Sequence, residues 1–207
     1  MEDVLDVYKR PYDPKRPQIC MDETSTQLIG DVRPSLPARR GRPARQDTEY
    51  RRNGVANLFS MVEPLTGQVE ITVTERRTKV DWAHFMKEVV DVHYPEAEQI
   101  VLVLDNLNTH GKASLYEAFP PHQAKRIADK LEIHPTPKHG SWLNIAEVEH
   151  SILATQCLDR RIPSLLVLQR EVRAWARDRN LHPTPVNWRF TTDDARIKLT
   201  RLYPSLR

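Results

Sequence analysis

IVLVLDN, residues 100–106, is the stretch of sequence that decides the fold. Residues 100–104 form the most apolar run in the chain, and each is β-branched or leucine. A run of this kind, without alternating polar residues, predicts a strand that is buried on both faces, as in a parallel sheet. The run ends abruptly at Asp105 and Asn106. Open α/β sheets bind their ligands beyond the carboxyl ends of the strands, so Asp105 is the first candidate site residue.

The flanking sequence predicts the neighbours of this strand. Residues 17–21 are a short apolar run that predicts a second buried strand, ending at Asp22. Residues 55–62 and 69–73 predict two further strands joined by a turn. The other predicted elements are a helix that Asp81 caps and Pro95 ends, helices within 111–130 broken at Pro120, a short strand at 131–134, and helices starting near Asn144 and after Ser164. This order predicts an α/β fold with a mixed sheet.

Composition narrows the class of protein. The chain has 207 residues, of which 39% are hydrophobic and 29% charged, and this balance suits one globular domain. No apolar run approaches the roughly 20 residues of a membrane helix, and the N-terminus is too acidic for a signal peptide. Cys20 and Cys157 form neither a disulfide framework nor a CxxC pair. We therefore expect a soluble, cytoplasmic protein without a membrane partner.

The net charge of +3 conceals an uneven distribution. Residues 33–52 carry a net charge of +5 and residues 159–207 a net charge of +6, which leaves −8 for the remainder. An acidic body with two basic flanks is suited to hold cations in its body and a polyanion on its flanks. The alternative interpretation is that these charges are solvated surface. Prolines and Gly41 within 31–52 predict a basic loop without regular structure.

Two carboxylates follow the two predicted buried strands. If these strands are neighbours, Asp22 and Asp105 meet at one edge of the sheet. Like charges in proximity are unfavourable unless a cation neutralises them, and Mg²⁺ prefers oxygen ligands. The alternative is that each Asp only begins a turn or caps a helix.

A third acid is expected on the helix that starts near Asn144. Glu147 and Glu149 are the two candidates, and residues two apart on a helix point in nearly opposite directions. Both acids therefore cannot face the same site. The phase of the helix alone does not choose between them, and both could be surface acids.

Three strings resemble the acidic motifs of bacterial insertion-sequence transposases that are related to the eukaryotic mariner elements. They are ICMDET at 19–24, VLVLDNLNTH at 101–110 and PKHGSWLNIAEVE at 137–149. The second family motif reads Asp-Asn with a His a few residues on, as do Asp105, Asn106 and His110. The third family motif reads Leu-Asn-Pro-Ile-Glu, and residues 143–147 match it except that Ile-Ala replaces Pro-Ile.

The resemblance covers residues 17–190 and implies a ribonuclease H-like fold, with a mixed central sheet flanked by helices. Residues 1–16 are then a segment before this domain, and residues 191–207 a C-terminal tail. The family holds its metal with a DDE or DDD triad, which corresponds here to Asp22, Asp105 and Glu147 as catalytic residues and metal ligands. The possible auxiliary residues are Asn106, His110 and Glu149, the last also being the fallback for the third acid.

The implied activity is cleavage and transfer of DNA strands during transposition. Such chemistry uses two Mg²⁺ or Mn²⁺ ions about 3.5–4 Å apart. The implied partner is double-stranded DNA, both element ends and target, bound by a dimer or larger assembly near the bacterial nucleoid. Two other functions stay open, a stand-alone metal-dependent DNA nuclease and a catalytically inactive DNA-binding remnant of a transposase.

Family members carry helix-turn-helix domains before the catalytic domain, whereas this chain starts shortly before its first acid. This indicates a truncated element or one half of a protein made from two reading frames. DNA contact is therefore assigned to phosphates, which basic side chains bind without sequence specificity. The predicted DNA-binding residues are Arg39, Arg40, Arg42, Arg45, Arg51 and Arg52.

Overall fold

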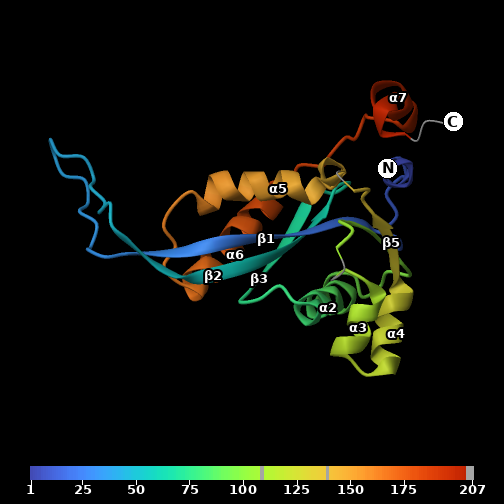
Figure 1. Cartoon of the computed structure of the whole chain (residues 1–207), viewed down its shortest axis with the longest axis horizontal. Coiled ribbons are helices and arrows are strands. Elements are labelled where there is room, and N and C mark those ends of the chain that lie inside the picture. The colour runs from blue at the N-terminus through green and yellow to red at the C-terminus, as the bar shows by residue number, and fades with distance from the viewer. Residues whose placement is uncertain (108–109, 139, 204–207) are drawn as a thin grey trace.

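A computed structural model describes residues 1–107, 110–138 and 140–203. Five strands form one mixed sheet in the order β3-β2-β1-β4-β5 (Figure 1). The strands are β1 Gln18–Asp31, β2 Tyr50–Glu63, β3 Gln68–Thr74, β4 Ile100–Leu104 and β5 Leu131–Pro135. β4 is parallel to both β1 and β5, and β2 is antiparallel to both β1 and β3. The predicted mixed sheet and the predicted buried central strand are confirmed.

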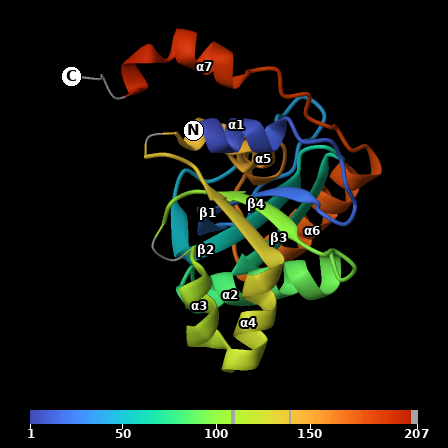
Figure 2. The ribbon, with the colours of Figure 1, turned by 90° about the vertical axis from the view of Figure 1, so that its right-hand side faces the viewer.

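Helices cover both faces of the sheet (Figure 2). The helices of the described residues are α1 Glu2–Tyr8, α2 Lys79–Glu88, α3 Lys112–Ala118, α4 Pro121–Lys130, α5 Ile145–Leu153, α6 Leu165–Leu181 and α7 Thr192–Lys198. Of these, α7 packs on α1 rather than on the sheet. Short π or 3-10 turns are η1 Val89–His93, η2 Ser141–Leu143, η3 Ala154–Leu158 and η4 Thr200–Leu202. Within the described part of the chain, no helix combines the length and the apolar character needed to cross a bilayer.

Successive side chains of β4 point to opposite faces of the sheet, so the hydrophobic core has two halves. Ile100, Leu102 and Leu104 pack with α2, α3 and α4 on one face, and all three are buried. Val101 and Val103 point the other way and pack with α1 and the start of α5. Successive side chains of a strand alternate between faces, so an all-apolar strand requires helices on both faces.

The first strand extends far beyond its apolar start. The sequence predicted its end at Asp22, but β1 continues to Asp31, so Asp22 lies within the strand. The polar residues after Asp22 stay extended because β2 pairs with them, from Cys20 opposite Val62 to Asp31 opposite Tyr50. The pairing joins residues far apart in the sequence, so the local pattern of apolar residues could not predict it.

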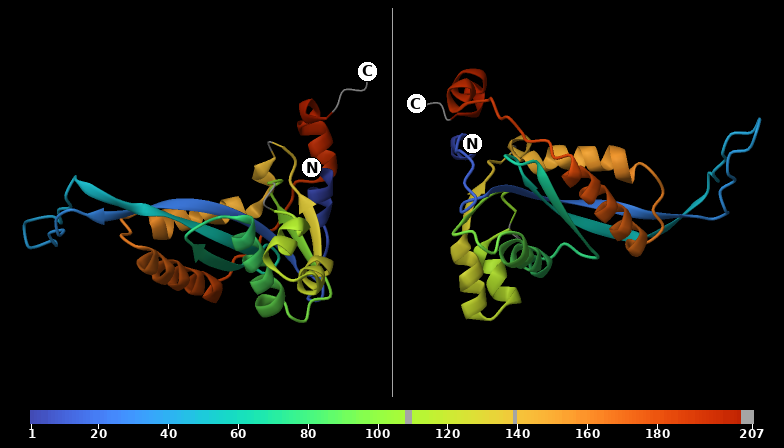
Figure 3. Two further views of the ribbon diagram at one scale, coloured as in Figure 1. Left: turned by 60° about the horizontal axis from the view of Figure 1, so that its bottom comes forward. Right: turned by 180° about the vertical axis from the view of Figure 1, so that it is seen from behind.

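β1 and β2 leave the body together as a two-stranded ribbon (Figure 3). Residues 32–49 join the two strands at its far end, and we call residues 28–55 the arm. The predicted basic loop 31–52 is therefore shorter than expected, because Asp31 and residues 50–52 belong to the strands. Within the remaining loop, two isolated β-bridges pair Leu36 with Arg45 and Arg39 with Arg42.

One helix start differs from expectation, and two agree with it. The sequence favoured Asp81 as a cap, but Thr78 is the N-cap of α2, and Asp81 returns a hydrogen bond to it from the third helical position. This reciprocal capping box satisfies two backbone donors at once. Asn144 and Ser164 cap α5 and α6, as predicted.

The N-terminal helix α1 was not predicted from the sequence. Val4, Leu5 and Val7 are fully buried in it, and the Tyr8 hydroxyl donates a hydrogen bond to the carbonyl of Leu143 at 2.6 Å. A helix of seven residues is marginal by itself, so its stability comes from packing on the sheet and on α7.

Gly67 offers a test of the packing between the β2–β3 turn and the segment after α6. Its φ is +75°, and a Cβ there would lie 2.5 Å from the backbone of Thr184. We expect Gly67→Ala to lower the free energy of unfolding by at least about 2 kcal/mol, because backbone strain and a backbone clash add. Urea unfolding measures this loss.

The matched control is Gly54→Ala. Gly54 has a φ of +101°, and a Cβ at this position would meet no atom within 4 Å, so only the backbone strain of about 1 kcal/mol applies. Equal losses in the two variants would show that Thr184 does not restrict this turn.

Candidate functional site

The register of the sheet sets Asp22 beside Asp105. Cys20 of β1 is level with Val103 of β4 in the parallel ladder. Asp22 and Asp105 each stand two residues further along, so both carboxylates lie at the same height on neighbouring strands. The strands are neighbours, which is the condition for a shared site.

Glu147 is brought to this edge by the amide of Asn144. The Asn144 side chain accepts a hydrogen bond from the N–H of Ala146 at 3.2 Å and donates one to the carbonyl of Met21 at 2.9 Å. Asn144 is therefore both the cap of α5 and its attachment to β1, one residue before Asp22. Glu147 is half-buried in the first turn of this helix.

The negative charges of Asp105 and Glu147 act on Asp22. Burial raises the pKa of Asp22 to about 7, and the negative charges of Asp105 and Glu147 add to the rise. A hydrogen bond from the N–H of Glu23 to the Asp22 carboxylate, 2.8 Å long, opposes it. A carboxyl with this pKa is in an environment that disfavours a further negative charge, and a bound cation would relieve it.

Glu149, the alternative third acid, forms an ion pair away from Asp22. It is 5% exposed and forms an ion pair with Arg179 of α6, at 2.7 Å between Oε1 and Nε. The guanidinium also contacts the second carboxylate oxygen at 3.3 Å. The geometry therefore favours Glu147 as the acid that faces Asp22.

His110 joins two acids beneath the site. Its Nδ1 is hydrogen-bonded to Asp105, its Nε2 contacts Glu23 at 2.5 Å, and its ring stacks on Trp82. Burial alone would lower the pKa of His110, but the bonds to Asp105 and Glu23 outweigh it and raise the pKa to about 9. A charged imidazolium between two carboxylates then holds Asp105 in position. His110 was predicted as an auxiliary residue but Glu23 was missed, because its only signal in the sequence is its place after Asp22.

His150 was also missed. Its Nε2 lies 2.9 Å from the hydroxyl of Ser60, and its Nδ1 lies 3.8 Å from a carboxylate oxygen of Asp22. Burial lowers the pKa of His150 to about 4, although the charge of Glu23 opposes the shift, so the ring is neutral near pH 7. The signal in the sequence is its spacing of three residues from Glu147, which places both on one side of α5.

An open cleft of about 640 Å³ adjoins Asp105. It is lined by Asp105, Asn106, Leu107, Thr136, Pro137, Lys138 and Ser141. Asn106, the predicted auxiliary residue, is exposed in it.

Trp142, 43% exposed, lies edge-on to Phe190. Asn108, Thr109 and His139, which belong to the second and third sequence motifs, lie outside the described residues.

The donor set fits Mg²⁺ or Mn²⁺, because both ions accept carboxylate oxygens and complete their shells with water and substrate phosphate. Among the residues described, no three His, Cys, Asp or Glu side chains already stand close enough together to hold an ion. The carboxylates would have to draw together around the cation. Burial, and to a smaller extent the charges of Asp105 and Glu147, raise the pKa of Asp22, so a bound cation would stabilise its ionised form.

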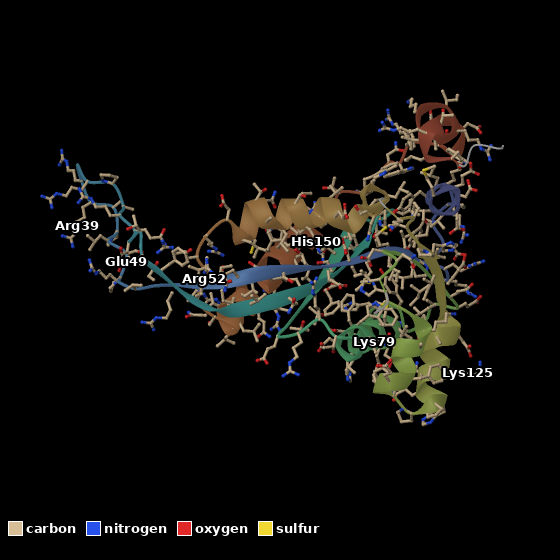
Figure 4. The ribbon with its side chains drawn as sticks, viewed as in Figure 1. Arg39, Glu49, Arg52, Lys79, Lys125 and His150 are labelled. Carbon is tan, nitrogen blue, oxygen red and sulfur yellow. The ribbon has the colours of Figure 1, made fainter. Side chains whose placement is uncertain are left out.

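The arm carries the basic residues that were predicted to bind DNA. Figure 4 shows Arg39 at its far end and Arg52 where the ribbon approaches the body. All six predicted arginines are exposed, and none forms an ion pair with any residue that the structure describes. They are Arg39, Arg40, Arg42, Arg45, Arg51 and Arg52. Unpaired guanidinium groups are free to bind phosphate.

The ribonuclease H-like fold is shared with solved structures of a transposase. The crystal structure of the Mos1 mariner paired end complex with Mn is 15% identical with a TM-score of 0.55, and the match covers 86% of this chain and 55% of that chain. The Mos1 strand transfer complex is 13% identical with a TM-score of 0.57, covering 86% and 54%. This chain thus spans about half the length of these relatives. A comparison with curated proteins finds no match.

A family model gives the more specific result. It describes the DDE superfamily endonucleases and matches residues 17–169, which is more than half of the chain. The matched region runs from the start of β1 into α6 and contains Asp22, Asp105 and Glu147. The chain belongs to the DDE superfamily of endonucleases.

Proposed function

We propose that this chain is the catalytic domain of a DNA transposase, which cleaves DNA strands and transfers them with the help of divalent metal ions. The observation that carries the proposal is the placement of Asp22 and Asp105 on neighbouring strands, with Glu147 on the first turn of α5. The charges of Asp105 and Glu147 lie near enough to add to the rise in the pKa of Asp22. The family and the fold shared with Mos1 support it.

In this proposal Asp22, Asp105 and Glu147 hold two Mg²⁺ or Mn²⁺ ions. When bound, the ions would activate the attacking oxygen, stabilise the charge on the phosphate and neutralise the leaving oxygen. No covalent bond between protein and DNA is needed. The chain's own contribution is therefore to position carboxylates, and Asn144 and His110 do this for Glu147 and Asp105 respectively.

The cleft beside Asp105 is where the DNA backbone would enter. Lys138, which belongs to the third sequence motif, is the basic residue among those lining the cleft; it is exposed and suited to contact a phosphate. The arginines of the arm would hold the duplex further away. Both sets of contacts add affinity but read no bases. Assembly into a dimer or larger complex on element ends and target DNA belongs to the same proposal.

The principal test is Asp105→Asn, which keeps the size of the side chain and removes its charge. We expect nicking of a supercoiled plasmid in Mn²⁺ or Mg²⁺ to fall to background, because a neutral amide holds a divalent cation poorly. Asp129→Asn on the exposed face of α4 is the control and should nick like the unmodified chain. Undiminished nicking by Asp105→Asn would exclude Asp105 from the site. Joining of a labelled oligonucleotide to the plasmid separates a transposase from a nuclease.

Glu147→Gln and Glu149→Gln form a pair that identifies the third acid. We expect Glu147→Gln to lose nicking with little change in stability. Glu149→Gln should keep nicking but lower the free energy of unfolding by about 1–3 kcal/mol, because Arg179 loses the charge that it pairs with. Plasmid nicking and urea unfolding of both variants measure the two effects. The opposite pattern would assign the metal site to Glu149.

The arm is tested by a salt titration of DNA binding. Each phosphate contact contributes about −0.9 to the slope of log affinity against log salt. Changing Arg39, Arg40, Arg42 and Arg45 to Ala should therefore flatten the slope by about 3 to 4, equally for two unrelated duplexes.

The control for this measurement removes the same charge elsewhere. Lys9, Lys15, Lys125 and Lys130 are spread over the end of α1, the segment after it and α4. Their replacement by Ala should change the slope much less if the arm makes local contacts. Similar slopes for the two quadruple variants would mean that only the net charge matters.

A further inference from the structure

His150 occupies a central position between α5 and the sheet. It lies one helical turn after Glu147, so both side chains project from the same side of α5. Figure 4 shows His150 on the side of α5 that faces β1 and β2. Its side chain is 13% exposed. A polar ring at such a place needs partners for both of its nitrogens.

The two partners of His150 are themselves a pair in the sheet. Ser60 of β2 is directly opposite Asp22 of β1 in the antiparallel ladder, so their side chains share one face. His150 lies over this pair, with Nε2 at 2.9 Å from the Ser60 hydroxyl and Nδ1 at 3.8 Å from the Asp22 carboxylate. Ser60 is fully buried, so the imidazole is its polar partner.

These contacts define what the ring can offer at Nδ1. A neutral imidazole carries one proton, and in the tautomer whose Nε2 donates to the Ser60 hydroxyl the lone pair of Nδ1 is directed at Asp22. A lone pair and a carboxylate oxygen repel each other across 3.8 Å unless something positive lies between them. In that tautomer, and with Asp22 ionised, two electron-pair donors face each other and can share one cation.

The spacing is also suitable for a shared ion. Ligands about 2.1 Å from an octahedral ion lie about 3.0 Å apart when adjacent and about 4.2 Å apart when opposite. The 3.8 Å between Nδ1 of His150 and Oδ2 of Asp22 falls between these values. A small rotation of either side chain would bring both atoms to one cation.

We propose that His150 is a fourth protein ligand of the metal site, binding through Nδ1 the ion that Asp22 holds. This inference rests on the proposed function, because it adds to the carboxylate site described there. Ser60 is a positioning residue that keeps the Nδ1 lone pair free. A nitrogen ligand favours transition-metal ions over Mg²⁺, which takes oxygen ligands. The site thereby gains a preference for Mn²⁺ that three carboxylates alone would not supply.

Binding of Mn²⁺ alone to the full chain tests the inference without any DNA cleavage. Electron spin resonance of Mn²⁺ measures the dissociation constant, and electron spin-echo modulation detects a nitrogen nucleus bonded to the ion. We expect nitrogen modulation in the unmodified chain and its loss in His150→Phe. We also expect Mn²⁺ affinity to fall about 10-fold or more and Mg²⁺ affinity to change far less.

Two further variants serve as controls for folding and for loss of an unrelated histidine. His150→Gln keeps a hydrogen-bonding group near Ser60 but no imidazole, so it should lose the modulation with its fold retained, as circular dichroism would report. His84→Ala, on the exposed side of α2, should keep both modulation and affinity.

Two results would overturn the inference. One is Mn²⁺ bound to the unmodified chain without nitrogen modulation, and the other is unchanged modulation in His150→Phe. The carboxylate site is judged separately, by Asp22→Asn. Full Mn²⁺ affinity in that variant would contradict the proposed function itself, whatever His150 does.

Discussion

The attachment of α5 to β1 through one buried amide is the constraint on which the rest of the site depends. Asn144 caps the helix with its side-chain oxygen and donates a hydrogen bond to the carbonyl of Met21 with its nitrogen. The amide can do both only if the first turn of α5 lies against β1 immediately before Asp22. The separation of Glu147 from Asp22, and of His150 from Ser60, follows from that docking.

Charge balance is the second organising factor. Asp22, Asp105 and Glu147 lie near enough at one edge of the sheet for the charges of the last two to raise the pKa of Asp22, and Glu23 adds a fourth acid nearby. The imidazolium of His110 contacts both Glu23 and Asp105, and its single positive charge offsets one of their two negative charges. Among the described residues Asp22 has no cationic partner, because the ring of His150, 3.8 Å away, is neutral near pH 7. The uncompensated charge is thus on the side of the sheet where α5 lies.

Local patterns predicted much of this fold, and long-range pairing accounts for what they missed. The apolar run at 100–104 and the caps Asn144 and Ser164 are local signals, and the strand and both helices form as expected. The continuation of β1 past Asp22 depends on β2, and the short helix α1 depends on the core that it covers. The same limit applies to the site. Asp105 follows a recognisable strand, whereas Glu23 and His150 gain their roles only from neighbours far away in sequence.

The strands β1 and β2 run without a break from the site into the arm. Asp22 and Asp31 are on one continuous strand, and nine residues of strand span about 30 Å. That length equals the rise of about nine base pairs of DNA, at about 3.4 Å each. The register of the β1–β2 ladder shifts only between Gln27 and Ile29. In the proposed function, a duplex bound at both ends of the ribbon would be contacted at two points about nine base pairs apart. If that duplex bent, we would expect the ribbon to deform first at the register shift between Gln27 and Ile29.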